Sequence, residues 1–114
     1  MTIKKLTDAA LKFRDERDWA QFHNPKDMAL SMSLEVAELL ELMQWKNGRE
    51  LVAHLKSRRT DVAHELSDIL YWVLVIANDL KIDLDEEFHD KLAHNAKKYP
   101  IERARGKAKK YTEL

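Results

Sequence analysis

The chain has 114 residues, 45% apolar and 35% charged, which is the size of one domain with one hydrophobic core. Two glycines and two prolines are too few for the many tight turns of a β-sandwich, and the absence of cysteine excludes disulfides and thiolate chemistry. Twenty basic and twenty acidic residues cancel, and neither a spanning apolar run nor a signal-peptide core is present, so we expect a cytoplasmic protein with neither nucleic acid nor membrane as a partner.

The first apolar repeat predicts a helix from about residue 6 to residue 18. Thr7 or Asp8 is expected near its cap. An aromatic segment without helical periodicity follows at residues 19–23. The sequence therefore predicts a break between the first helix and the next one.

Asn24-Pro25 predicts the start of a second helix, because Asn caps well and Pro fits the first helical position. The apolar repeat carries this helix to about Gln44. Asn47-Gly48 then breaks it, and a short third helix over about residues 50–56 follows.

A longer helix is expected from a cap at Thr60 to about Leu80. Its segment at residues 69–77 is apolar on every face and rich in β-branched side chains, so local propensity alone would also fit a strand. Continuity with the periodic stretch before it favours a buried helix. Because so small a protein cannot cover such a helix on all sides, we expect part of it to face a second subunit.

Asp83, with Glu86 three residues later, predicts the start of a last helix that ends near Tyr99, before Pro100. The predicted fold is all-α, a four- to five-helix bundle-like subunit. Residues 1–100 are expected to form the helical domain and residues 101–114 a basic tail.

Two pairs of acids stand out on the second and fourth predicted helices. Glu35 and Glu38 form one pair, and Glu65 and Asp68 form the other. A spacing of three residues puts both carboxylates of a pair on one helix face, and antiparallel helices would bring the two pairs together. Four oxygen ligands of this kind suit Mg²⁺ or Mn²⁺ rather than zinc, although such pairs are also common on solvated helix faces.

At these residues the sequence resembles the MazG-like all-α nucleoside triphosphate pyrophosphohydrolases, and within them the dCTP pyrophosphatase group. The resemblance rests on Glu35-Val36-Ala37-Glu38, Glu65-Leu66-Ser67-Asp68, Trp19 with Gln21-Phe22-His23, Gln44-Trp45-Lys46, Tyr99-Pro100 and Lys110-Tyr111-Thr112. It implies magnesium-dependent cleavage of a (deoxy)nucleoside triphosphate between the α and β phosphates, with Glu35, Glu38, Glu65 and Asp68 as ligands. It also implies a homo-oligomer, either a dimer or a dimer of dimers, and that residues 1–100 form the pyrophosphohydrolase domain.

The resemblance also implies that Trp19, His23 and Trp45 contact the nucleotide. Two positions depart from the group. Ala10 stands where some relatives have a histidine, and Trp72 stands where a nucleotide-contacting tyrosine is expected, with Tyr71 beside it. These changes bear on the preferred base more than on the chemistry.

Further candidates come from the residues themselves. Glu38 is expected to accept a proton from the attacking water as well as to bind metal. The flat faces of Trp19 and Trp45 suit base stacking, although core packing would also explain these residues. Lys91, Asn95 and Lys98 share one face of the last helix and, with Lys46, are expected to meet the triphosphate, unless that face is only solvated.

Two other functions compete with an enzyme. One is a helical binding or regulatory module without turnover, against which the intact acids argue. The other is a nucleic-acid-binding module that uses the basic tail, against which the zero net charge argues.

Overall fold

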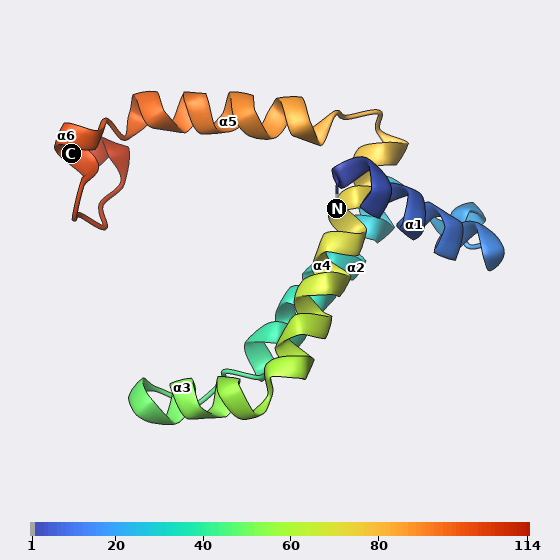
Figure 1. Cartoon of the computed structure of the whole chain (residues 1–114), viewed down its shortest axis with the longest axis horizontal. Coiled ribbons are helices and arrows are strands. Elements are labelled where there is room, and N and C mark those ends of the chain that lie inside the picture. Colours follow the sequence, from blue (N-terminus) through green and yellow to red (C-terminus); the bar gives the residue numbers. More distant parts are fainter. Residues whose placement is uncertain (1) are drawn as a thin grey trace. The chain divides into compact units, whose positions relative to one another are not determined.

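The computed structural model describes residues 2–114, and this part of the chain is helical and contains no strand (Figure 1). The all-α prediction is confirmed, and residues 69–77 are helical. The elements are α1 (Ile3–Glu16), η1 (Ala20–Phe22), α2 (Pro25–Glu41), α3 (Gly48–Ser57), α4 (Arg59–Asp79), α5 (Leu84–Lys98), α6 (Ile101–Ala104) and η2 (Tyr111–Glu113), where η marks a short 3-10 helix. They form two compact units, Met1–Lys81 and Ile82–Leu114.

Two of the predicted helix starts are confirmed. The side chain of Asn24 accepts a hydrogen bond from the backbone N–H of Asp27 at 2.9 Å, and Pro25 is the first residue of α2. Asp83 accepts one from the backbone N–H of Glu86 at 3.2 Å, which caps α5. Both caps satisfy an amide that a helix start would otherwise leave without a partner.

Two other predicted caps are wrong. Thr2, and not Thr7 or Asp8, caps α1, because the helix begins at Ile3, ahead of the apolar repeat that located it. Thr60 lies inside α4. The N–H of Arg58 still donates to the carbonyl of His54 at the end of α3, at 2.9 Å, so α3 runs into α4 with no loop in which a cap could sit.

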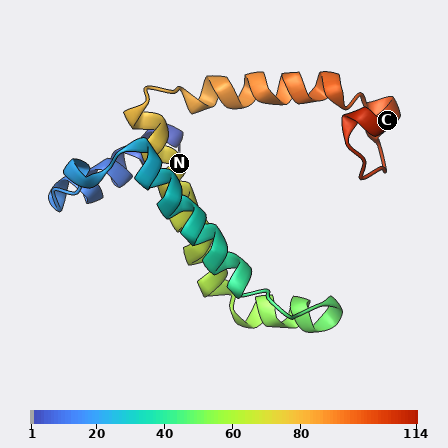
Figure 2. The same ribbon diagram turned by 180° about the vertical axis from the view of Figure 1, so that it is seen from behind.

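The helix α2 ends at Glu41, three residues before the predicted end at Gln44. The chain then turns through Trp45 and Gly48, which have φ angles of 69° and 54°. This left-handed backbone is costly for a tryptophan and natural for a glycine. The turn leads into α3, after which α4 runs back along α2, and α2 and α4 lie side by side and antiparallel in both views (Figures 1 and 2).

The core of the first unit lies at the end of this helix pair where α1 packs. Ala10 of α1, Met28 of α2 and Val75 of α4 are buried together, with Tyr71 and Trp72 packed against them. The buried guanidinium of Arg14 donates two hydrogen bonds to Asp79, at 2.8 and 3.1 Å. This bidentate pair ties α1 to the last turn of α4.

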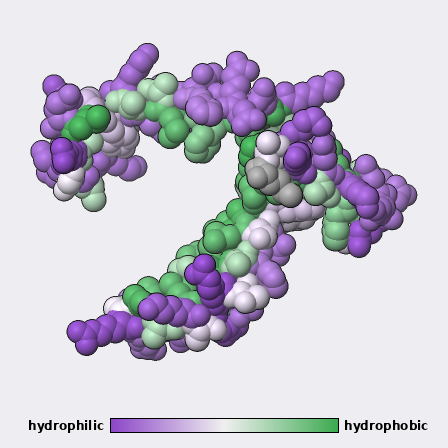
Figure 3. All heavy atoms as spheres, in the orientation of Figure 1, coloured by the Kyte–Doolittle hydropathy of each residue, from purple (hydrophilic) through white to green (hydrophobic). Residues whose placement is uncertain are grey.

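Large apolar side chains remain exposed along the rest of the pair. Leu34 and Leu40 on α2 are 65% and 61% exposed, and Leu66 on α4 is 53% exposed. Hydrophobic atoms are visible on the surface of α3 and α4 in the space-filling view (Figure 3). No helix within residues 2–114 has both the length and the apolar character that crossing a membrane requires.

The second unit holds α5, α6 and η2. The rings of Tyr99 and Tyr111 meet edge to face, with centroids 6.1 Å apart, and the ammonium of Lys98 lies 4.7 Å from the ring centroid of Tyr111. The basic tail therefore folds back onto the end of α5. The predicted boundary between a catalytic domain and a tail after residue 100 stays a prediction.

Candidate metal centre

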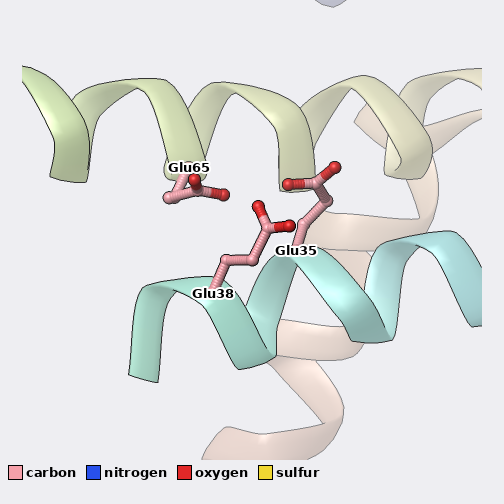
Figure 4. A group of neighbouring side chains, drawn as sticks. All are labelled: Glu35, Glu38 and Glu65. Atoms are coloured by element: carbon pink, nitrogen blue, oxygen red, sulfur yellow. The ribbon is translucent and has the colours of Figure 1, made fainter. Parts of the chain in front are cut away.

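Three carboxylates meet between α2 and α4. Glu35 and Glu38 point from α2 toward Glu65 on α4, and one oxygen of each lies within 4.8 Å of those of the other two (Figure 4). The three-residue spacing puts Glu35 and Glu38 on one face of α2, as expected. Two oxygens on opposite sides of one Mg²⁺ lie about 4.2 Å apart, at about 2.1 Å from the ion each. Small side-chain rotations would therefore bring the three oxygens onto one cation.

Burial makes this cluster electrostatically costly without a cation. Glu35 and Glu65 are half-buried, and the Oε2 atom of each is buried without a hydrogen-bond partner among the described residues. Burial, followed by the adjacent carboxyls of Glu65 and Glu38, raises the pKa of Glu35 to about 7. Burial also raises the pKa of Glu65. Unpartnered buried carboxylate oxygens in this number fit a hard divalent cation, which would satisfy and neutralise them.

Asp68 lies one turn beyond Glu65 on α4 and is exposed. It does not belong to the group of three, although its negative charge contributes to the raised pKa values of Glu35 and Glu65. Its role as a fourth ligand stays a prediction.

Three of the predicted substrate residues lie together near the α1 end of the helix pair. The rings of His23 and Trp72 meet edge to face with centroids 5.2 Å apart, and Trp72 contacts Tyr71 at 5.0 Å. Trp19 joins the same group through Phe13, at 5.7 Å, and is 42% exposed. Burial lowers the pKa of His23, so its imidazole is neutral at pH 7 and can both donate and accept a hydrogen bond.

Trp45 and Lys46 lie at the other end of α2. Trp19 precedes α2 in the chain and Trp45 follows it, and the 17 residues of this helix span about 25 Å. One base therefore cannot contact both tryptophans within one chain. Trp45 is 88% exposed, and its predicted contact with the nucleotide stays a prediction.

A surface cavity of about 540 Å³ adjoins the carboxylates at this same end. Its acidic lining residues are Glu38, Glu41, Asp61 and Glu65, and its basic lining residues are Lys46, His54 and Arg58. The sequence singled out only Lys46 among these bases. His54 and Arg58 were not predicted. They lie four residues apart just before the second acid pair, and this spacing is the signal in the sequence that could have found them.

The remaining predicted substrate residues belong to the second unit. Lys91 is exposed on α5, whereas Asn95 and Lys98 are half-buried there. Their spacing puts them on one helix face, as expected. Their contact with the triphosphate stays a prediction.

The sequence of this chain matches a known protein family and several known proteins. The model of the MazG-like family matches residues 30–114, which include all four predicted metal ligands. The chain belongs to the MazG-like family. It is 38% identical to dCTP pyrophosphatase 1 of Bos taurus over 115 aligned positions, which cover 99% of this chain and 68% of that protein.

Two further relatives agree with this placement. Identity to dCTP pyrophosphatase 1 of Homo sapiens is 37% over the same coverage. The crystal structure of a pyrophosphatase from Archaeoglobus fulgidus superposes with a TM-score of 0.80 at 38% identity, over 85% of this chain and 91% of that one. The MazG-like resemblance of the sequence is thereby confirmed.

Proposed function

We propose that this MazG-like chain is a nucleoside triphosphate pyrophosphohydrolase that uses Mg²⁺, or Mn²⁺ in its place, and cleaves a dCTP-like deoxynucleotide to the monophosphate and pyrophosphate. The observation that carries the proposal is the convergence of Glu35, Glu38 and Glu65, with two buried oxygens that have no partner among the described residues. The similarity to dCTP pyrophosphatases supports the choice of substrate class.

The residues of the cluster have two roles. A divalent cation held by Glu35, Glu38 and Glu65, with Asp68 as the predicted fourth ligand, would neutralise charge on the phosphate oxygens and acidify a water molecule. Glu38 is exposed, unlike its two neighbours, and so can reach that water and accept its proton. The water oxygen forms the new bond to phosphorus, and the bond to the pyrophosphate oxygen breaks in line.

The aromatic group formed by Trp19, His23 and Trp72, at the end of the helix pair where α1 packs, recognises the base. Trp72 lies seven residues after Glu65 on α4, which places it about 10 Å from the carboxylates along the helix axis. This is the reach of a nucleoside from its α phosphate. The neutral His23 beside Trp72 can read a polar base edge, while the exposed face of Trp19 offers a stacking surface.

The decisive experiment is pyrophosphate release from a panel of nucleoside triphosphates with Mg²⁺. We expect turnover by the unmodified chain, most efficiently with a cytosine deoxynucleotide, and loss of turnover in Glu38→Ala. Glu16→Ala is the matched control, since Glu16 lies exposed on α1 in an ion pair with Lys12. No turnover of any nucleotide by the intact chain would favour a non-catalytic helical module instead.

We also propose that the subunit functions as a dimer or a dimer of dimers. The exposed leucines of α2 and α4 form an apolar surface of the kind that a second copy covers. Light scattering on a size-exclusion column should give a mass at least twice that of one chain, and Leu34→Lys should lower it. The cytoplasmic location, and the expectation that neither nucleic acid nor membrane is a partner, stay predictions.

A further inference from the structure

The cavity lies at the end of the α2–α4 pair that is connected to α3 (the α3 end), and two of its lining residues also belong to the metal centre. Glu38 and Glu65 belong to both sites, whereas Lys46, His54 and Arg58 line the cavity alone. A phosphate group held at the carboxylates therefore has direct access to this cavity.

The positions of residues along α4 indicate how the substrate is oriented in the site. On α4, Trp72 lies seven residues after Glu65, and Arg58, which immediately precedes the helix, lies seven residues before it. Each separation corresponds to about 10 Å of helix rise, in opposite directions. If the base lies against Trp72 and His23 and the cleaved bond at the carboxylates, the β and γ phosphates must extend toward Arg58.

The basic side chains of this cavity have N–H donors that can bind an anion. Arg58 donates its Nε–H to Asp61, but a guanidinium has five N–H donors, and the pair is about half exposed, so it exchanges readily with another anion. The Nζ of Lys46 lies 4.0 Å from Glu50, which is the outer limit of an ion pair. His54 is half-buried beside them.

From this placement we infer that His54 and Arg58, together with Lys46, form a pyrophosphate subsite that binds the leaving half of the substrate. The inference rests on the proposed function and extends it to residues that neither the acid pairs nor the aromatic group include. It requires that the departing diphosphate stay on the α3 side while the nucleoside monophosphate stays on the α1 side.

The charge of the cavity sets a condition on binding. Four acids line it against Lys46, Arg58 and one histidine, so an anion is repelled until a cation neutralises the carboxylates. Inorganic pyrophosphate should therefore bind with Mg²⁺ and not without it.

The test is calorimetric binding of inorganic pyrophosphate to the full chain, with and without Mg²⁺, in Arg58→Gln and in the matched control Arg59→Gln. Arg59 is the next residue along the chain but lines a different cavity, with Met43 and Val62. We expect Arg58→Gln to weaken binding about tenfold, the scale of one charge-assisted hydrogen bond, and Arg59→Gln to leave it unchanged. His54→Asn should weaken it in the same direction.

A second titration, with dCMP and Mg²⁺, makes the inference specific. Arg58→Gln should leave dCMP affinity unchanged, because the monophosphate lies on the other side of the carboxylates. Equal losses in the two arginine variants, equal losses for the two ligands, or no loss at all would overturn the subsite. Circular dichroism of each variant separates these results from misfolding.

The two proposals fail separately. Nucleotide turnover with pyrophosphate binding that is insensitive to Arg58 removes the subsite alone. Pyrophosphate binding that depends on Mg²⁺ and Arg58, in a chain that turns over no nucleotide, removes the enzymatic proposal and leaves the subsite.

Discussion

The two ends of the α2–α4 helix pair differ in their packing and in how their charged groups are paired. At the α1 end, Met28 and Val75 are 1% and 0% exposed, and the buried Arg14 is paired with Asp79. Toward the α3 end, leucines stay exposed and the buried oxygens of Glu35 and Glu65 have no hydrogen-bond partner among the described residues. The α1 end packs its apolar core and pairs its buried charge within one chain, although the Nδ1 of His23 and the hydroxyl of Tyr71 there also have no hydrogen-bond partner among the described residues. The α3 end leaves like charges for a cation and an apolar surface for a second subunit.

This difference indicates which end of the helix pair stabilises the fold and which end carries the activity. Packed side chains and paired charges stabilise the fold, while desolvated acids of like charge destabilise it until a ligand arrives. Substitutions at the two ends should therefore move stability and activity in different combinations.

The largest expected effect is on activity, at the carboxylates. Glu35→Gln keeps the shape of the side chain but removes a charge, so we expect turnover to fall by about 10²–10³-fold, the scale for losing one preorganised electrostatic group. The same change should raise the melting temperature of the metal-free protein, because it relieves repulsion from Glu38, Glu65 and Asp68. Pyrophosphate release and thermal unfolding in EDTA measure the two effects. A variant that loses both activity and metal-free stability would contradict the division between the two ends.

The next largest effect is on stability, in the core. Met28→Ala empties a fully buried position and should cost about 2–5 kcal/mol in the free energy of unfolding. Leu34→Ala on the exposed face of the same helix should cost the isolated subunit less than about 0.5 kcal/mol. Urea unfolding at several protein concentrations checks both, since a subunit contact at Leu34 would appear as concentration-dependent stability. Similar costs at the lowest concentration would show that the two positions do not differ.

The Arg14–Asp79 pair should give a smaller loss. Asp79→Asn leaves the Arg14 guanidinium buried without its counter-charge, and we expect a cost of about 2–3 kcal/mol, below the range for fully buried pairs because the Asp79 side chain is 26% exposed. Hydrogen bonding from Arg14 lowers the pKa of Asp79 below its ordinary 3.8. The pair therefore stabilises the fold fully above that ordinary value, and its contribution is lost as the pH falls through the lowered pKa. The difference between wild type and variant in urea unfolding should shrink below about pH 4, while a pH-independent difference would mean that the loss is one of packing.

Most of the fold could be predicted from the sequence, because helix starts at Asn24 and Asp83 and the apolar repeats are local signals. The missed caps show where such signals fail. The chain passes from α3 into α4 at Arg58 with no intervening loop, and no local rule states that the residue that ends one helix will also cap the next.

The site could be predicted in part, for the same reason. The three-residue spacing of Glu35 and Glu38 is a local property, and the return of α4, which brings Glu65 to them, was expected from the break at Asn47-Gly48. The role of His54 and Arg58 as neighbours of these acids depends on how α3 packs against α2 and α4, which is a tertiary property. The contribution of α5 depends in turn on a second unit of the chain.

The smallest expected effect is the release of protons when a metal ion binds. It should depend on the carboxylates toward the α3 end and not on Asp79 at the α1 end. The pKa of Glu35 is raised to about 7, so the metal-free fold holds a proton there that the unfolded chain loses near pH 4.5, and stability falls as the pH rises between these values. A cation requires the ionised carboxylate, so Mg²⁺ binding at pH 7 should release about half a proton from Glu35, nearly one at pH 5.5 and almost none at pH 8.5. Calorimetry in buffers of different ionisation enthalpy counts these protons, and Asp79→Asn, at the α1 end, should leave the count unchanged. A proton count that does not vary with pH would mean that Glu35 is already ionised in the metal-free protein, and the α3 end would then carry no electrostatic cost for the cation to relieve.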